Sequence, residues 1–122
     1  MGIVIGIDVG ISTTKIVGIV EQGKVLSPIR IKATDPVTSL YGAFGKFLYV
    51  NKIQLQDIEK VMLTGVGSAY INEPIYNLPT EKAEEFIADG LGARYETKLD
   101  RMIVVSMGTG TSIVKCDGED IK

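Results

Sequence analysis

The residues best suited to chemistry lie between two apolar runs near the start of the chain. Asp8 ends the first run, and Lys15 opens the second run after a short bend. The bend contains Gly10, Ser12 and Thr13. A glycine lets backbone amides approach a ligand closely, hydroxyls and a lysine add donors and positive charge, and a carboxylate can hold Mg²⁺. This assembly suits a polyphosphate with Mg²⁺, although glycine and small polar residues also occur in ordinary β-hairpin turns.

Composition excludes several classes of function. The chain has 122 residues, a net charge of −2 at pH 7 and 45% hydrophobic residues, which suits one soluble domain or one lobe of a larger protein. This charge predicts no broad basic surface for nucleic acid, and no run approaches the roughly 18 apolar residues of a membrane span. The first residues lack the layout of a signal peptide, so we expect a cytoplasmic protein without a membrane partner.

Histidine is absent from the sequence, and Cys116 is its single cysteine. Catalytic triads that use histidine are therefore excluded, as are the usual zinc enzymes, an internal disulfide and a cysteine-rich metal site. Acid–base chemistry must come from carboxylates, lysine or tyrosine, and any metal is expected to be bound by oxygen. Phosphoryl transfer fits this inventory, because it depends mainly on positioning and electrostatics.

The hydrophobic pattern predicts an α/β chain. Apolar runs indicate strands over residues 2–9, 15–21, 25–33, 60–64, 101–107 and 112–116. Asp35 and Pro36 are suited to begin a helix with one apolar stripe, and Thr80 is suited to cap a second helix with glutamates in its first turns. Residues 75–78 are expected to be extended. The order β-β-β-α-β-α-β predicts a mixed five-stranded sheet with helices on both faces.

Two further glycine turns follow strands. Residues 107–112, MGTGTS, repeat the strand–turn–strand pattern of the first hairpin, and two such hairpins facing each other would hold a nucleotide's phosphates from both sides. Residues 64–68, TGVGS, resemble the dinucleotide-binding fingerprint only superficially, because Tyr70 stands where a third small residue belongs. We therefore expect a glycine turn there that leads into a short helix at the edge of the same site.

The sequence resembles the superfamily of actin, sugar kinases and heat-shock ATPases in its stretch GIDVGISTTK, its element order and its second glycine hairpin. Within this superfamily, the closest resemblance is to type II pantothenate kinases. Residues 6–15 match the first phosphate loop of these kinases, although Ile11 stands where they often have a second glycine. Residues 85–92, EFIADGLG, resemble the segment that bears their catalytic glutamate, and residues 107–112 resemble the loop that contacts phosphate and pantothenate.

The resemblance implies a ribonuclease H-like ATPase lobe of the actin type over residues 1–100 and the opening hairpin of a second lobe over residues 101–122. It covers only the first half of these enzymes, whose second lobe supplies most of the adenosine pocket. We therefore expect a truncated chain or one lobe of a split protein. Members of this kinase family are homodimers, so the resemblance also implies a homodimer.

The resemblance further implies an activity and residue roles. These kinases transfer a phosphoryl group from ATP, with Mg²⁺, to the terminal hydroxyl of pantothenate in the first step of coenzyme A biosynthesis. Glu85 is implied as the general base, with Glu84 as the alternative. Asp8 is implied to organise Mg²⁺, and Lys15 to neutralise the transferred phosphoryl group. The implied contacts are Gly10, Ser12, Thr13, Gly108, Thr109 and Gly110 for phosphate, and Thr109 and Ser112 for pantothenate. No arginine matches the substrate-binding arginine that the family places after the second hairpin.

Three other functions stay open. Another sugar kinase of this fold usually has an aspartate base in a motif for which this sequence has no match. The ATPase activator of 2-hydroxyacyl-CoA dehydratases has a very similar first loop but carries cysteines that ligate a cluster, and Cys116 alone argues against it. A non-catalytic actin-like module would use the nucleotide only to switch conformation, and Glu85 would then be dispensable.

Overall fold

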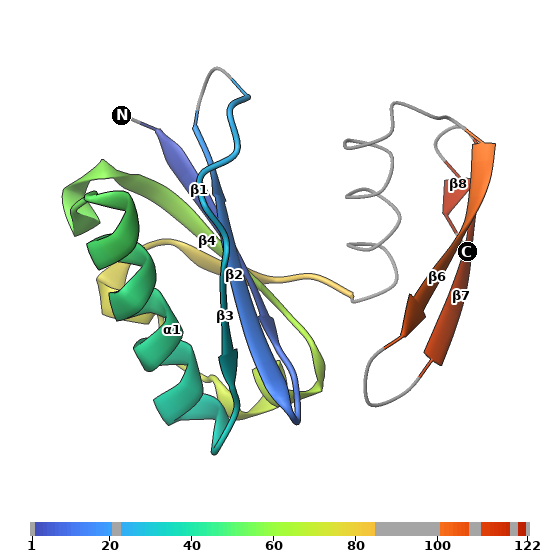
Figure 1. Cartoon of the computed structure of the whole chain (residues 1–122), viewed down its shortest axis with the longest axis horizontal. Helices are drawn as coiled ribbons and strands as arrows, with labels where there is room; N and C mark the ends of the chain where they lie inside the picture. Colours follow the sequence, from blue (N-terminus) through green and yellow to red (C-terminus); the bar gives the residue numbers. More distant parts are fainter. Residues whose placement is uncertain (1, 21–22, 85–100, 108–110, 118–119, 122) are drawn as a thin grey trace. The chain divides into compact units, whose positions relative to one another are not determined.

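The structure, a computed structural model, describes residues 2–20, 23–84, 101–107, 111–117 and 120–121 of the chain (Figure 1). The chain divides into two compact units, Met1–Lys82 and Ala83–Lys122. The described part of the first unit holds a five-stranded sheet with helix α1, and the second unit holds a separate three-stranded sheet.

The sheet of the first unit is mixed. Its strands are β1 (Ile3–Val9), β2 (Thr13–Ile19), β3 (Ile29–Lys32), β4 (Ile58–Thr64) and β5 (Thr80–Lys82), in the spatial order β3-β2-β1-β4-β5. Strand β2 pairs antiparallel with β1 and β3, whereas β4 pairs parallel with β1 and β5. The predicted α/β class with a mixed five-stranded sheet is confirmed, and the carboxyl ends of β1 and β4 lie at the same edge.

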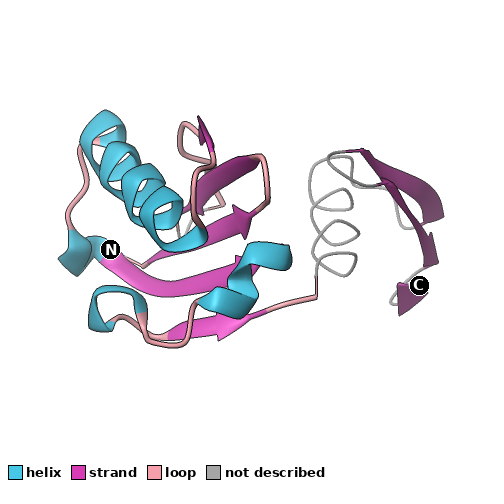
Figure 2. Ribbon diagram, turned by 90° about the horizontal axis from the view of Figure 1, so that it is seen from below, coloured by secondary structure: helices cyan, strands magenta, loops and turns pink. Residues whose placement is uncertain are grey.

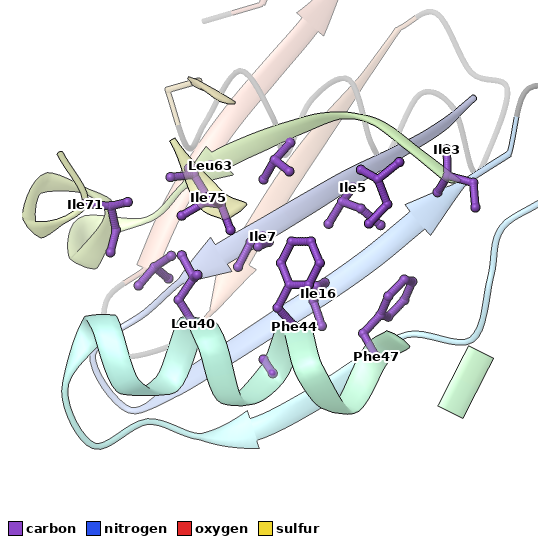
Figure 3. Close-up of a cluster of buried hydrophobic side chains, with 14 residues drawn as sticks. Ile3, Ile5, Ile7, Ile16, Leu40, Phe44, Phe47, Leu63, Ile71 and Ile75 are labelled. Atoms are coloured by element: carbon purple, nitrogen blue, oxygen red, sulfur yellow. The ribbon is translucent and has the colours of Figure 1, made fainter. Parts of the chain in front are cut away.

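Helix α1 (Pro36–Asn51) covers one face of this sheet (Figure 2). The odd-numbered residues of β1 are buried beneath the helix, and the even-numbered residues between them are half-buried on the opposite face. The apolar stripe of α1 supplies Leu40, Phe44 and Phe47 to the same core (Figure 3). The predicted amphipathic helix is confirmed, and the strand alternation directs Asp8 to the face opposite α1.

Phe44→Ala is expected to destabilise the first unit strongly. The Phe44 side chain is fully buried, and its ring lies edge-on to Tyr76 with the centroids 5.3 Å apart. Removing the ring leaves a cavity, which typically lowers the free energy of unfolding by about 3–5 kcal/mol. Urea unfolding followed by circular dichroism would measure this loss. Tyr49→Ala, on the same helix, is the matched control because Tyr49 is 85% exposed. Equal stability of the two variants would contradict the packing.

The start of α1 depends on Asp35, as the sequence predicts. The carboxylate accepts a hydrogen bond from the backbone N–H of Thr38, 2.9 Å from Oδ1, and Pro36 lies in the first turn. The Thr38 hydroxyl, and after it the Thr38 backbone N–H, lower the pKa of the Asp35 carboxyl below its ordinary value, since both donate to the ionised form.

Asp35→Ala is expected to lower the melting temperature in a way that depends on pH. Because the folded-state pKa is lowered, the ionised cap stabilises the chain fully above the ordinary aspartate pKa of about 4, and this stabilisation is lost as the pH falls through the lowered pKa. Thermal unfolding at acid and neutral pH would measure the effect. Asp35→Asn, which caps without titrating, should remove this part of the pH dependence; an unchanged pH profile for Asp35→Asn would contradict the assignment.

The segment around Thr80 differs from the prediction. Thr80–Lys82 is strand β5 rather than the start of a helix, because its backbone pairs parallel with β4. The Thr80 hydroxyl accepts a hydrogen bond from the N–H of Ile75 at 3.0 Å and donates one to the carbonyl of Leu78 at 2.9 Å, so it closes a turn instead of capping a helix. The rest of the expected helix, with Phe86 and Leu91 on its apolar side, lies outside the described residues.

The shorter segments of the first unit agree with the predicted structure only in part. The 3₁₀ helices of the first unit are η1 (Leu55–Asp57), η2 (Val66–Tyr70) and η3 (Ile75–Asn77). Helix η2 confirms the predicted glycine turn into a short helix, whereas η3 replaces the expected extended segment 75–78, with Tyr76 in the left-handed region at a φ of 51°. Strand β3 is shorter than the expected 25–33, since Pro28 has no N–H to pair and Val25 forms only an isolated bridge.

The described part of the second unit is an antiparallel sheet. Its strands are β6 (Arg101–Met107), β7 (Thr111–Asp117) and β8 (Asp120–Ile121), in the order β6-β7-β8. The predicted strand 101–107 and its return strand are confirmed, but they belong to this sheet, and the fifth strand of the first sheet is β5. Within the described ranges, no helix is long and apolar enough to cross a membrane.

Candidate functional site

Asp8 and Lys15 face each other across the β1–β2 hairpin. They are paired in register, so both side chains lie on the face of the sheet opposite α1. Asp8 is half-buried and Lys15 is exposed. Directly opposite residues of an antiparallel pair have Cβ atoms about 4.5–5.5 Å apart, so the carboxylate and the ammonium group attract each other. The end of β1 therefore presents a negative and a positive group side by side.

The turn of this hairpin is shorter than the predicted bend. Strand β2 begins at Thr13, so only Gly10, Ile11 and Ser12 connect the two strands. The N–H of Gly10 donates to the carbonyl of Thr13 at 3.1 Å, and a Cβ on Gly10 would overlap with that carbonyl oxygen. The carbonyl of Ser12 accepts a hydrogen bond from the N–H of Ala33 at 3.0 Å, which holds the turn at the end of β3. The structure thus brings Gly10, Ser12 and Thr13 together in a turn tight enough to require glycine.

A row of polar residues crosses the sheet at the level of Asp8. Thr64 of β4 lies opposite Asp8 on one side, and Lys15 lies opposite it on the other, with Arg30 of β3 next to Lys15. Lys32, two residues along β3, adds a third cation on the same face. Like charges directly opposite each other on a sheet are unfavourable. The excess positive charge beside the glycine turn therefore suits an anionic ligand.

The turn after β4 lies against Asp8. Gly65 has a φ of 92°, a conformation that residues with a side chain rarely adopt. A Cβ on Gly65 would lie 2.5 Å from Oδ1 of Asp8 and 2.6 Å from the carbonyl oxygen of Val9, and a Cβ on Gly67 would lie 2.6 Å from Cγ1 of Val9. The Ser68 hydroxyl closes the turn by donating to the carbonyl of Gly65 at 2.7 Å. The backbone of this turn therefore approaches β1 as closely as glycine allows.

This glycine turn is predicted from the sequence to lie near the site, but no pattern predicts a role for its residues. Thr64 and Gly65 are neighbours of Asp8 because β1 and β4 are parallel and end at the same edge of the sheet. One signal in the sequence points to them: the apolar runs of β1 and β4 end in Asp8 and Thr64, and each of these polar residues is followed within two positions by glycine. Arg30 is not predicted as a site residue, because the sequence does not show which residues face each other on neighbouring strands.

Asp8 is the carboxylate expected to hold Mg²⁺. In the part of the chain that the structure describes, no group of three or more acidic, histidine or cysteine side chains is arranged to share a metal ion. A Mg²⁺ ion that accompanies a nucleotide needs no such group, because one or two carboxylates hold it together with waters and phosphates. A half-buried carboxylate beside a glycine turn and a lysine is a donor set that fits Mg²⁺ with a polyphosphate.

The other predicted site residues belong to the second unit. Glu85, Gly108, Thr109 and Gly110 lie outside the described residues. Ser112 is in β7, opposite Ser106 of β6 and close to the end of that hairpin. Each unit is defined by its own contacts, so the expected meeting of the two glycine hairpins stays a prediction.

Comparison with known proteins identifies the fold. No family model matches the sequence, and no curated protein matches it. The activator of the 2-hydroxyisocaproyl-CoA dehydratase from Clostridium difficile with bound ADPNP is 16% identical, with a TM-score of 0.81 over 98% of this chain and 44% of that chain. Component A of the (R)-2-hydroxyglutaryl-CoA dehydratase of Acidaminococcus fermentans is 13% identical, with a TM-score of 0.83 over 99% of this chain and 46% of that chain.

The chain has the actin-like ATPase fold. A ROK family glucokinase from Streptomyces griseus in complex with glucose and AMPPNP shares it, with 15% identity and a TM-score of 0.67 over 99% of this chain and 46% of that chain. Similarities at this level of identity establish the fold and not the activity. The chain spans a little under half the length of each of these three structures. The resemblance to pantothenate kinases rests on the sequence motifs alone.

Proposed function

We propose that this chain is the phosphate-binding part of an ATP-dependent kinase whose acceptor is pantothenate. The observation that carries the kinase proposal is the arrangement at the end of β1, where Asp8, Lys15 and a tight glycine turn lie side by side. The fold, shared with structures that contain ADPNP and AMPPNP, supports ATP as the nucleotide. Residues 85–92 and 107–112 support pantothenate through their resemblance to type II pantothenate kinases.

In the proposed reaction, the first hairpin binds the phosphates of ATP. The amides and hydroxyls of Gly10, Ser12 and Thr13 donate hydrogen bonds to phosphate oxygens. The resemblance to type II pantothenate kinases adds Gly108, Thr109 and Gly110 to the proposed phosphate contacts. Lys15 neutralises the charge on the transferred group, because its ammonium lies on the same face as Asp8. Asp8 would hold Mg²⁺, which would supply positive charge to the phosphates.

Glu85 accepts the proton of the pantothenate hydroxyl as the transfer proceeds. The hydroxyl oxygen forms a bond to the γ-phosphorus, the bond from that phosphorus to the bridging oxygen of ADP breaks, and ADP leaves with the electron pair. Thr109 and Ser112 hold pantothenate through their hydroxyls. By the same resemblance, residues 101–122 open a second lobe, and the kinase is a cytoplasmic homodimer.

An ATPase that activates a 2-hydroxyacyl-CoA dehydratase is the second candidate. The two dehydratase-component structures fit this chain with TM-scores of 0.81 and 0.83, against 0.67 for the glucokinase, and this difference favours it. An activator of this type needs cysteines to ligate its cluster, and the chain offers Cys116 alone. It would hydrolyse ATP without an alcohol acceptor, whereas a kinase would transfer the phosphoryl group.

The deciding experiment is incubation of the intact protein with Mg²⁺, ATP and pantothenate, followed by mass spectrometry. Formation of 4′-phosphopantothenate, with one ADP for each product, is the expected result. Glucose in place of pantothenate is the matched control for a sugar kinase. Hydrolysis of ATP without any phosphorylated acceptor, together with the visible absorption of an iron–sulfur cluster, would favour the activator. Bound ATP without either product would overturn the pantothenate proposal and keep the nucleotide site.

A further inference from the structure

We infer that the turn after β4 is a further part of the Asp8 site: Gly65 positions the Asp8 carboxylate, and the buried hydroxyl of Thr64 donates a hydrogen bond to a phosphate oxygen held beside it. This inference rests on the proposed function of Asp8 and assigns a role to residues that the motifs of the first hairpin do not include. It adds to the site the end of β4, a strand that is distant in sequence from the first hairpin.

Gly65 sets the space that is left for the carboxylate. A Cβ at this position would lie 2.5 Å from Oδ1 of Asp8, which is closer than side-chain atoms approach each other, so any larger residue would displace the carboxylate or the turn. The backbone of Gly65 also has a φ of 92° and a ψ of 160°, a combination that is essentially restricted to glycine. Such conformations persist where the surrounding structure requires them, and they cluster at functional sites.

The Ser68 side chain keeps this turn in place. Its hydroxyl donates to the carbonyl of Gly65 at 2.7 Å, and its backbone N–H donates to the same oxygen at 3.1 Å. Ser68 therefore fixes the carbonyl of Gly65, while the α-carbon of Gly65 faces Asp8. A rigid backbone element beside a carboxylate fixes its rotamer, which is the usual task of groups that surround a metal-binding side chain.

The hydroxyl of Thr64 is the second feature of this turn that suits a ligand. It lies directly opposite Asp8 in the parallel β1–β4 pair, on the same face of the sheet. Its Oγ1 atom is buried and has no hydrogen-bond partner among the residues that the structure describes. Buried hydroxyls in proteins are almost always hydrogen-bonded, and an unused one costs free energy. A phosphate oxygen held at Asp8 would supply the missing acceptor.

The test compares ATP affinity with and without Mg²⁺ by calorimetric titration of the intact protein. In the wild type, Mg²⁺ is expected to strengthen ATP binding. Gly65→Ala should reduce this Mg²⁺-dependent gain about tenfold, which is a typical effect of changing a group that supports a metal ligand, and should leave binding in EDTA nearly unchanged. Thr64→Val, which keeps the shape but removes the hydroxyl, should weaken binding, and Thr64→Ser should restore it.

Gly67→Ala is the matched control for crowding in the same turn. Its Cβ would lie 2.6 Å from Cγ1 of Val9, so it strains the turn against β1 without touching the Asp8 carboxylate. Thermal unfolding of each variant separates a loss of folding from a loss of the site. An equal loss of the Mg²⁺-dependent gain in Gly67→Ala, or an unchanged gain in folded Gly65→Ala together with unchanged affinity in Thr64→Val, would overturn the inference. Absence of Mg²⁺-dependent ATP binding in the wild type would instead overturn the proposed function itself.

Discussion

Glu85→Gln should abolish turnover and leave ATP binding nearly intact. Glutamine keeps the size of the side chain but cannot accept the hydroxyl proton, and the loss of a positioned general base typically lowers the rate by about 10²–10⁴-fold. The effect should fall on kcat, because proton transfer occurs in the chemical step and not on binding. Formation of ADP in the presence of pantothenate would report turnover, and calorimetric titration with ATP would report binding.

Two further variants make this test decisive. Glu84→Gln examines the neighbouring carboxylate, to which the base role passes if the match to the family segment is shifted by one residue. Glu73→Gln changes an exposed carboxylate in a loop of the first unit and serves as the control. Normal turnover in both Glu85→Gln and Glu84→Gln would contradict a carboxylate base at this segment and favour a non-catalytic nucleotide-binding module. Loss of ATP binding in Glu85→Gln would also count against the base role.

Asp8→Asn should remove most of the Mg²⁺ dependence of ATP binding and lower kcat by about a hundredfold or more. The amide keeps the shape of the carboxylate but loses the charge that attracts Mg²⁺, and removal of one preorganised electrostatic group commonly costs about 10²–10³-fold in kcat. The same substitution leaves Lys15, which lies between Arg30 and Asp8 in the sheet, next to a like charge without the attraction of the Asp8 carboxylate. ATP binding measured in EDTA should therefore be retained or strengthened, while binding in Mg²⁺ falls.

Glu59→Gln is the matched control for this substitution. Glu59 is an exposed carboxylate in the same sheet, but it lies near the start of β4, whereas Thr64 at the other end of that strand is the neighbour of Asp8. Its removal changes the net charge equally and should leave the Mg²⁺ dependence unchanged. If Asp8→Asn and Glu59→Gln behave alike, the effect is one of overall charge, and Asp8 has no specific role in holding the ion.

Features that arise from neighbouring residues can be predicted from the amino-acid sequence. The apolar run of β1, the cap at Asp35 and the position of the turn at Gly10 depend on residues a few positions apart, so their patterns predict these features of the structure. The register that pairs Asp8 with Lys15 depends on the length of this turn, which is shorter than the predicted bend. The actin-like fold could be inferred because these local elements occur in a distinctive order.

Contacts between segments that are distant in sequence depend on the packing of the whole sheet. Thr80–Lys82 carries a helix-capping pattern but becomes β5, since pairing with β4 satisfies its backbone hydrogen bonds at a sheet edge. Gly65 lies next to Asp8 because β4 is parallel to β1. The two residues are far apart in the sequence, so no local pattern links them. Local patterns record the preferences of short segments, whereas register between remote strands depends on the packing of the whole sheet against α1.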